Sequence, residues 1–165
     1  MASEVFVRTA SERDLPAISA LLAETWHATY DGLYGAAGVT DISTRWHSVD
    51  WLRQMLRRPG SEFVVADTGD LLAGAGYAVL DAAGEVVELQ ELDVRPDMQG
   101  HGVGGLLLAE LEASFVDASL MRLDVEARNE RAVAFYRANG FAEVGRRPAT
   151  QWVDAMIVTM EKRLG

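Results

Sequence analysis

The chain has 165 residues, no cysteine and a net charge of −10 at pH 7. Its length is enough for one domain with a sizeable core and too short for two ordinary ones. The lack of cysteine excludes disulfides, thiolate metal sites and a cysteine nucleophile. The acidic charge argues against nucleic acid as a partner.

The N-terminal stretch MASEVFVRTASERD contains no basic segment followed by an apolar one, so it does not resemble a signal peptide. No apolar run approaches the length needed to cross a bilayer. We therefore expect a cytoplasmic protein without a membrane partner. The three scattered histidines, with no H-E-x-x-H motif, give no reason to expect a metal site.

The first half of the chain predicts one strand, two helical segments and three further strands. Alternation in EVFVRTA predicts a strand over residues 4–9. Apolar residues at helical spacing predict a helix over about 11–30, and a second helical segment over about 41–58 follows the glycine-rich break DGLYGAAG. Three antiparallel strands, separated by the turns DTGD and DAAG, are expected at 61–67, 71–80 and 85–94.

The second half predicts two helices and three strands. A glycine loop at 99–105 opens a helix whose buried stripe is Val103, Leu107, Leu111 and Phe115. A strand at 119–127 and a short helix at 129–139 follow, before two final strands at 141–147 and 151–164. The order β-α-α-β-β-β-α-β-α-β-β predicts a single α/β domain with an α+β mixed sheet over residues 1–165.

The loop QGHGVGG fits two phosphate-binding patterns. As G-x-G-x-x-G it matches a dinucleotide-binding turn, and Asp124 lies about where such a fold carries its ribose-binding acid. The segment RPDMQ, however, separates Val94 from Gly100, whereas a dinucleotide turn follows its strand at once. As Q-x-x-G-x-G the loop instead predicts backbone N–H groups that hold a pyrophosphate at a helix N-terminus.

Two motifs in order favour the second pattern. The segments LDVRPDMQGHGVGGLLL and LDVEARNERAVAFYRANGF lie about thirty residues apart. Together they resemble the GNAT superfamily of acetyl-CoA-dependent N-acetyltransferases, in its V-x-P-x-x-[RQ]-G-x-G-x-G loop and in its later strand, asparagine and tyrosine-bearing helix. The resemblance implies acetyl-CoA as cosubstrate, a primary amine as acceptor and, by analogy, a possible homodimer.

The resemblance also implies roles for individual residues. The backbone of Leu92, Asp93 and Val94 pairs with the pantetheine arm, and the N–H of Val94 holds the oxyanion. Asn129 contacts pantetheine, although it is equally suited to be a helix N-cap. Tyr136 protonates the departing thiolate. The residues expected around the pyrophosphate are Gln99, Gly100, His101, Gly102, Val103, Gly104 and Gly105.

Three carboxylates are candidates for the base that deprotonates the amine. Glu88 and Glu91 lie on the strand before the loop, on opposite faces because their spacing is odd. Asp124 lies on the next strand, where the ribosomal-protein N-acetyltransferase branch of the family carries a glutamate. Ordinary solvation or ion pairing explains each of them equally well, so the base stays open.

The acceptor site of this family is built from the first helices and the last hairpin. The candidates in those regions are Trp26, His27, Tyr30 and Trp152, within a wider aromatic set that includes Tyr34, Trp46, His47 and Trp51. Aromatic rings beside acids suit an organic cation, but helical core packing explains the same spacing. The function predicted is direct transfer of an acetyl group to a small amine or a peptide N-terminus. A catalytically silent acyl-CoA-binding module and a nicotinamide-dependent oxidoreductase are the alternatives.

Overall fold

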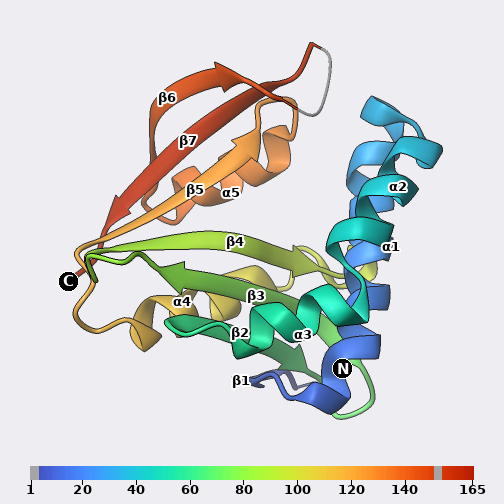
Figure 1. The fold of residues 1–165 in the computed structure, drawn as a ribbon, viewed down its shortest axis with the longest axis horizontal. Coiled ribbons are helices and arrows are strands. Elements are labelled where there is room, and N and C mark those ends of the chain that lie inside the picture. Colours follow the sequence, from blue (N-terminus) through green and yellow to red (C-terminus); the bar gives the residue numbers. More distant parts are fainter. Residues whose placement is uncertain (1–3, 151–153) are drawn as a thin grey trace.

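In the computed structural model, which describes residues 4–150 and 154–165, seven strands form one sheet in the order β1-β2-β3-β4-β5-β7-β6 (Figure 1). The strands are β1 (Phe6–Thr9), β2 (Ser61–Asp67), β3 (Leu72–Leu80), β4 (Val86–Val94), β5 (Leu120–Glu126), β6 (Ala142–Pro148) and β7 (Met156–Arg163). The predicted strands are all present in these residues, with ends that differ by a few positions.

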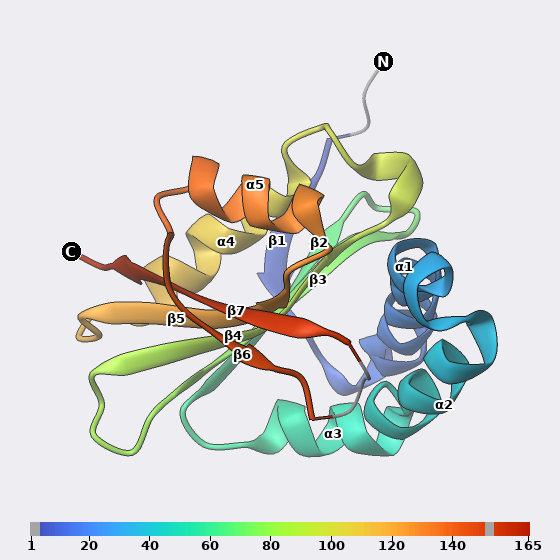
Figure 2. The same ribbon diagram turned by 90° about the horizontal axis from the view of Figure 1, so that it is seen from above.

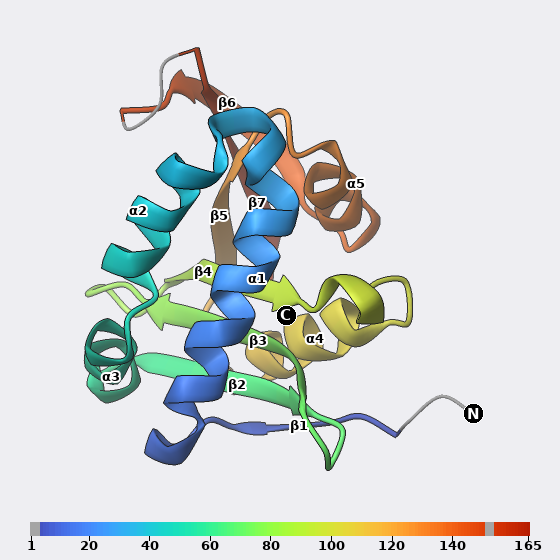
Figure 3. The ribbon, with the colours of Figure 1, turned by 90° about the vertical axis from the view of Figure 1, so that its right-hand side faces the viewer.

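Five α-helices cover the two faces of the sheet. They are α1 (Leu15–Tyr34), α2 (Ala36–Trp46), α3 (Val49–Arg57), α4 (Val103–Ser114) and α5 (Glu130–Ala138), in the described part of the chain. Helices α4 and α5 lie on one face and α1, α2 and α3 on the other (Figure 2). Seen from the side in Figure 3, α1 crosses the sheet between α2 and α3 on one side and α4 and α5 on the other.

Between neighbouring strands of the described sheet, only β4 and β5 run parallel. They pair over three positions, Val86–Glu88 with Leu120–Arg122, and then diverge (Figure 1). Beyond that point the edge of β4 that faces β5 has no strand partner. The sheet is therefore mixed, as predicted, and it is not the parallel doubly wound sheet that the dinucleotide alternative requires.

Two clusters of buried side chains hold these layers together. One lies under α4 and α5 and contains the predicted stripe of α4, in which Val103, Leu107 and Leu111 are at most 2% exposed. The other lies under α1 and α3, where Leu15 and Ile18 pack on Tyr77 of β3. Removing this apolar area from water supplies the main driving force for the fold.

The structure differs from the prediction in its second helical segment. Helix α1 continues through Gly32 to Tyr34, and the break comes at Gly35, whose φ is +80°. One glycine inside a helix costs only about 1 kcal/mol. The segment expected as one helix then forms α2 and α3, because Ser48 caps α3 by accepting a hydrogen bond from the N–H of Trp51.

Candidate active site

A cavity of about 1190 Å³ opens where β4 leaves β5, somewhat larger than the roughly 300–1,000 Å³ of an ordinary small-molecule site. Its walls come from α1, the end of β4, the glycine loop and the first turns of α5. Strand ends of β5, β6 and β7 complete it. The cavity therefore brings the two sequence motifs together with the N-terminal helix α1. No motif in the sequence indicated that contact.

The end of β4 presents its main chain to this cavity. The N–H of Arg95 bonds to the carbonyl of Ala73 on β3, and in an antiparallel ladder such bonds alternate along the strand. The polar main-chain groups of Leu92 and Val94 therefore point to the opposite edge, where β5 has moved away. The side-chain amide of Gln99 donates to the Val94 carbonyl at that edge, at 3.1 Å. The main-chain N–H and carbonyl of Asp93, in contrast, point toward β3 and not toward the cavity.

The glycine loop ends as the N-terminus of α4. Gly102 is the N-cap, with φ at +82°, a left-handed conformation that favours glycine. No side chain caps this helix end, so its first N–H groups remain available to an anion. The loop is therefore suited to bind an anion, and its contact with a pyrophosphate stays a prediction.

The remaining loop residues have different surroundings. A Cβ on Gly104 would lie 3.2 Å from the Phe135 ring, so this glycine permits α4 and α5 to pack closely. A Cβ on Gly105 would meet nothing within 4 Å, and Gly105 lines the cavity. The side chain of Val103 is buried in the core, which leaves only its main chain for a ligand. His101 is exposed and lies outside the set of cavity-lining residues.

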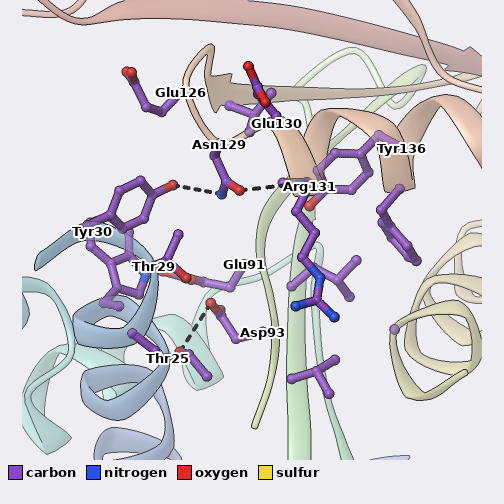
Figure 4. Close-up of a pocket in the computed structure, with 18 of the residues that line it drawn as sticks. Thr25, Thr29, Tyr30, Glu91, Asp93, Glu126, Asn129, Glu130, Arg131 and Tyr136 are labelled. Atoms are coloured by element: carbon purple, nitrogen blue, oxygen red, sulfur yellow. Dashed lines mark hydrogen bonds between the residues drawn. The ribbon is translucent and has the colours of Figure 1, made fainter. Parts of the chain in front are cut away.

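Tyr136 projects from α5 into the cavity (Figure 4). Its ring packs edge-on against Phe135 and Phe141. Burial, followed by the nearby charge of Asp93, raises the pKa of the phenol. Tyr136 is therefore a neutral hydrogen-bond donor at pH 7.

Asn129 connects two walls of the cavity. Its side-chain oxygen accepts from the N–H of Ala132, which makes it the N-cap of α5, as predicted. Its side-chain nitrogen donates to the hydroxyl of Tyr30 on α1, at 3.3 Å (Figure 4). Burial raises the pKa of Tyr30 to about 12. Both polar atoms of Asn129 are thus engaged by protein groups.

Arg131 is a cavity residue that the sequence analysis did not single out. Its side chain extends into the cavity from the first turn of α5 (Figure 4). Among the ion pairs of residues 4–150 and 154–165, none involves Arg131. An exposed, unpaired guanidinium suits a phosphate group. Its position in NERAVAF, two residues after the N-cap, was a usable signal.

The three candidate bases occupy different environments. Opposite Tyr77 and Ala78 of β3, the β4 register shifts by one residue, so Gln90 is extra. Glu88 pairs with Val79 and Glu91 with Tyr77, two residues of the same core cluster. Glu88 and Glu91 therefore share a face, and the prediction of opposite faces was wrong.

Glu88 and Asp124 are poorly suited to accept a proton. Glu88 is exposed and does not line the cavity. Asp124 lines it but is bound by Arg147, at 2.8 and 3.2 Å, and by the Thr159 hydroxyl, at 2.7 Å. Partial burial acts to raise the pKa of Asp124, and these hydrogen bonds outweigh it and lower the pKa. Asp124 is thus already neutralised by an ion pair.

Glu91 and Asp93, here called the Glu91–Asp93 pair, extend from β4 toward α1 (Figure 4). The side chain of Glu91 is 17% exposed, and Oδ2 of Asp93 is buried with no protein partner in the described part of the chain. Burial raises the pKa of both carboxyls, and the neighbouring Glu91 raises that of Asp93 further. Two close carboxyls that resist ionising together can share one proton.

The predicted acceptor residues fall into three groups. Trp26 and Tyr30 line the cavity from α1, with ring centroids 4.8 Å apart. His27 does not line it; its Nδ1 lies 2.6 Å from Asp31 on the same helix. Trp152 lies outside the described residues.

Residues 4–150 and 154–165 contain no cluster of histidine and acidic side chains that could bind a metal ion. In the same ranges, no helix combines the length and apolarity that a membrane crossing requires.

Comparison with curated proteins finds mycobacterial relatives over about half of the chain. It is 35% identical over 96 residues to the N-alpha-acetyltransferase RimI of Mycobacterium tuberculosis, which covers 56% of this chain and 59% of that protein. It is 38% identical over 90 residues to an uncharacterized protein of Mycobacterium leprae, which covers 52% of this chain and 24% of that protein. Less than two thirds of either relative is therefore matched.

Solved structures match over nearly the whole chain. The PaiA N-acetyltransferase of Thermoplasma acidophilum, determined in complex with coenzyme A, gives a TM-score of 0.86 at 23% identity over 97% of this chain and 99% of that one. A ribosomal-protein-alanine N-acetyltransferase of Brucella melitensis gives 0.74 at 25% identity over 96% and 99%. These similarities confirm the predicted fold class.

The profile of the Acetyltransferase (GNAT) family matches residues 19–141, which include both motifs and most of the cavity wall. This match confirms the predicted enzyme class, an acyltransferase of the N-acetyltransferase type. The chain belongs to the acetyltransferase (GNAT) family.

Proposed function

We propose that the protein transfers the acetyl group of acetyl-CoA directly to a primary amine, within one complex that contains both substrates. The main support is that the Glu91–Asp93 pair and Tyr136 face the same cavity, beside the free edge of β4. The first can accept a proton from an amine, and the second can donate one to a thiolate. With no cysteine in the chain, direct transfer needs fewer assumptions than a covalent intermediate.

Several groups fit acetyl-CoA, which supplies the activated thioester when bound. The N–H groups at the start of α4 suit its pyrophosphate, and Arg131 suits a phosphate. The outward-facing main chain of Leu92 and Val94 can bond to the pantetheine arm as an added strand would. Coenzyme A in the similar Thermoplasma protein supports the same assignment.

The residues of the chain divide the proton transfers between them. An alkylamine with a pKa near 10.4 is only about one part in 10³ neutral at pH 7, so it must lose a proton before it can attack. Glu91 accepts that proton, and the Val94 N–H stabilises the charge that develops on the thioester oxygen. As the C–N bond forms and the C–S bond breaks, Tyr136 donates to the leaving sulfur. The nitrogen then loses its second proton, which restores the neutral Tyr136 phenol by way of solvent, while Glu91 releases the first proton to water.

The charge of the site supports a cationic acceptor. In the described part of the chain, neither Glu91 nor Asp93 forms an ion pair with a lysine or arginine. The faces of Trp26 and Tyr30 are close to the pair and attract cations as well. A small amine and a peptide N-terminus both satisfy this chemistry. The names of the Mycobacterium tuberculosis and Brucella relatives support the peptide, as a proposal for this chain.

The first test is thermal unfolding with acetyl-CoA and, separately, with NAD(H). A ligand at 100 times its Kd stabilises the fold by about 2.7 kcal/mol, which raises Tm by a few degrees in a domain of this size. We expect a shift with acetyl-CoA alone. A shift only with NAD(H) would contradict the proposal.

The second test is release of free thiol from acetyl-CoA with a panel of alkylamines and unblocked peptides. A peptide with a blocked N-terminus and an internal lysine separates side-chain from N-terminal acceptors. Thiol release that depends on an amine supports the proposal. Acetyl-CoA binding without release for any amine in the panel would favour the silent binding module instead.

A further inference from the structure

We propose that His47 is a positioning residue that keeps Glu91 the ionised member of the Glu91–Asp93 pair, so that Glu91 and not Asp93 accepts the proton of the amine. The inference rests on the proposed function and deepens it. Its basis is a contact between the C-terminal end of α2 and β4, two elements that are more than forty residues apart in the chain.

His47 is held tightly in the protein interior. Its side chain is 2% exposed, and its ring packs edge-on against Trp26, with centroids 5.2 Å apart. The hydroxyl of Ser19 on α1 donates to its backbone carbonyl, at 2.5 Å. Different groups therefore hold the backbone and the ring of His47, so each can be removed separately by mutation.

The two nitrogens of the ring have different neighbours. Nδ1 lies 3.0 Å from the Ser43 hydroxyl, and Nε2 lies 3.5 Å from Oε1 of Glu91. Burial lowers the pKa of His47, against the opposing charge of Asp93, so the ring is neutral at pH 7. If the Ser43 hydroxyl donates to Nδ1, the single ring proton is on Nε2 and faces Glu91. An N–H directed at a carboxylate favours its ionised form.

Asp93 has weaker support for a negative charge. The hydroxyl of Thr25 donates to its carboxyl, but at a long distance of 3.4 Å from Oδ1. That hydroxyl has one proton and is closer to the Leu22 carbonyl, at 3.1 Å. Burial raises the pKa of Asp93 well above its usual range. Asp93 therefore retains the shared proton, which leaves Glu91 as the ionised member of the pair.

The other titratable groups near the pair do not change which carboxyl ionises first. Tyr30 of α1 and Tyr136 of α5 are neutral phenols, because burial raises the pKa of each. In the described chain, no arginine or lysine pairs with either carboxyl. Of these groups, His47 at the end of α2 is the one whose ring nitrogen faces Glu91, at 3.5 Å, and we expect the choice of base to depend on that contact.

The test is a titration of the Glu91 carboxyl by NMR, with ¹³C-labelled glutamate and aspartate in the full chain. Glu91→Gln and Asp93→Asn assign the two signals. His47→Phe keeps a ring but removes the donor, and we expect it to raise the midpoint of Glu91 by about one pH unit, the size of a hydrogen bond to a charged group. His47→Gln carries an amide N–H near the Nε2 position, and we expect it to restore most of the wild-type midpoint.

Two further variants separate the effect of the His47 ring on Glu91 from a general loss of packing around His47. Ser43→Ala removes the hydroxyl that fixes the ring tautomer, so we expect a smaller rise of the Glu91 midpoint. This variant tests the inference even if His47→Phe does not fold. Ser19→Ala removes the bond to the His47 backbone but leaves the ring contacts, so we expect no rise. A Glu91 midpoint that stays unchanged in both His47→Phe and Ser43→Ala, or that rises equally in Ser19→Ala, would overturn the inference.

Kinetics give an independent readout once an amine substrate is found. The acidic limb of kcat/KM against pH reports the pKa of the base in the free enzyme. We expect this limb to move to higher pH in His47→Phe by the same amount as the NMR midpoint. If the wild-type protein acetylates no amine, the proposed function fails, while the NMR titration still decides whether His47 acts on Glu91.

Discussion

Two walls of the cavity present different kinds of chemical groups. The glycine-loop wall, formed by Leu92, Val94 and residues 99–105, offers main-chain groups and an uncapped helix end. The acidic wall, formed by α1 and the Glu91–Asp93 pair, offers side chains that are partly removed from water. One cavity thus combines neutral main-chain N–H groups, which suit an anionic cofactor, with half-buried acids, which suit a cation and cost stability.

Tyr136 lines the same cavity from α5, so its replacement tests whether chemistry and cofactor binding are separable. Without the hydroxyl, Tyr136→Phe leaves the thiolate with no acid, and we expect kcat to fall by roughly 10²–10⁴-fold. The affinity for acetyl-CoA, measured by calorimetry, should be nearly unchanged. Undiminished turnover would remove Tyr136 as the acid.

Tyr77→Phe is the matched control for that variant. The Tyr77 hydroxyl donates to the Met55 carbonyl at 2.8 Å, away from the cavity. We expect it to lose about 1 kcal/mol of stability, the worth of one hydrogen bond, without loss of turnover. An equal fall in kcat for both variants would mean that Tyr136 acts through packing.

Asp93→Asn tests whether the Asp93 carboxyl in the acidic wall lowers the free energy of unfolding. Because the folded-state pKa of Asp93 is raised, its contribution to stability is fully present below the unfolded pKa, near 3.9, and is lost as pH rises through the folded pKa. Asparagine cannot ionise, so urea unfolding should find the variant more stable than wild type by roughly 1–3 kcal/mol at pH 8. The gain should shrink toward pH 5. A variant less stable than wild type at pH 8 would contradict this.

Asp14→Asn is the matched control with the opposite sign. Asp14 is buried at the start of α1 and accepts hydrogen bonds from Arg8, at 2.8 Å to each oxygen. These bonds lower its pKa, so its contribution is present above the unfolded pKa and is lost as pH falls through the folded one. We expect Asp14→Asn to lose about 3 kcal/mol at pH 8.

Gly105→Ala sharpens the assignment of the glycine-loop wall. A Cβ at this helical position meets no protein atom within 4 Å, so the helix should gain roughly 0.5–1 kcal/mol. The same Cβ would project where a phosphate approaches, so acetyl-CoA should bind more weakly. Gly32→Ala in α1 is the control, because Gly32 is equally open but outside the cavity. If neither variant changes the affinity for acetyl-CoA, the loop is not the cradle.

The fold was largely predictable because its elements carry local signals. The strands β2, β3 and β4 have turn sequences between them, and the stripe from Val103 to Leu111 marks α4. The boundary between α2 and α3 was missed although Ser48 is a recognisable N-cap. The continuation of α1 through Gly32 was less accessible, because it depends on packing against α2 and the sheet.

The candidate site was predictable only where its residues belong to local sequence motifs. Gly102, Asn129 and Tyr136 belong to motifs and line the cavity as expected. His27 and Glu88 do not line it, because His27 turns away on α1 and Glu88 lies where β4 still pairs with β5, whereas the bulge at Gln90 brings Glu91 to the face of Glu88. A bulge inverts the face of every later residue on a strand, and no residue type announces it.

The sequence by itself indicated the family, the order of elements along the chain and the glycine loop that opens α4, because such a loop is built from consecutive residues whose glycines are visible in the chain. Only the tertiary structure decided which carboxyls meet at the cavity and which groups surround them. Glu91, His47 and Asp93 come together because a bulge turns one strand and two helices pack against it. Their protonation depends on burial and on neighbours distant in sequence, which local patterns do not encode.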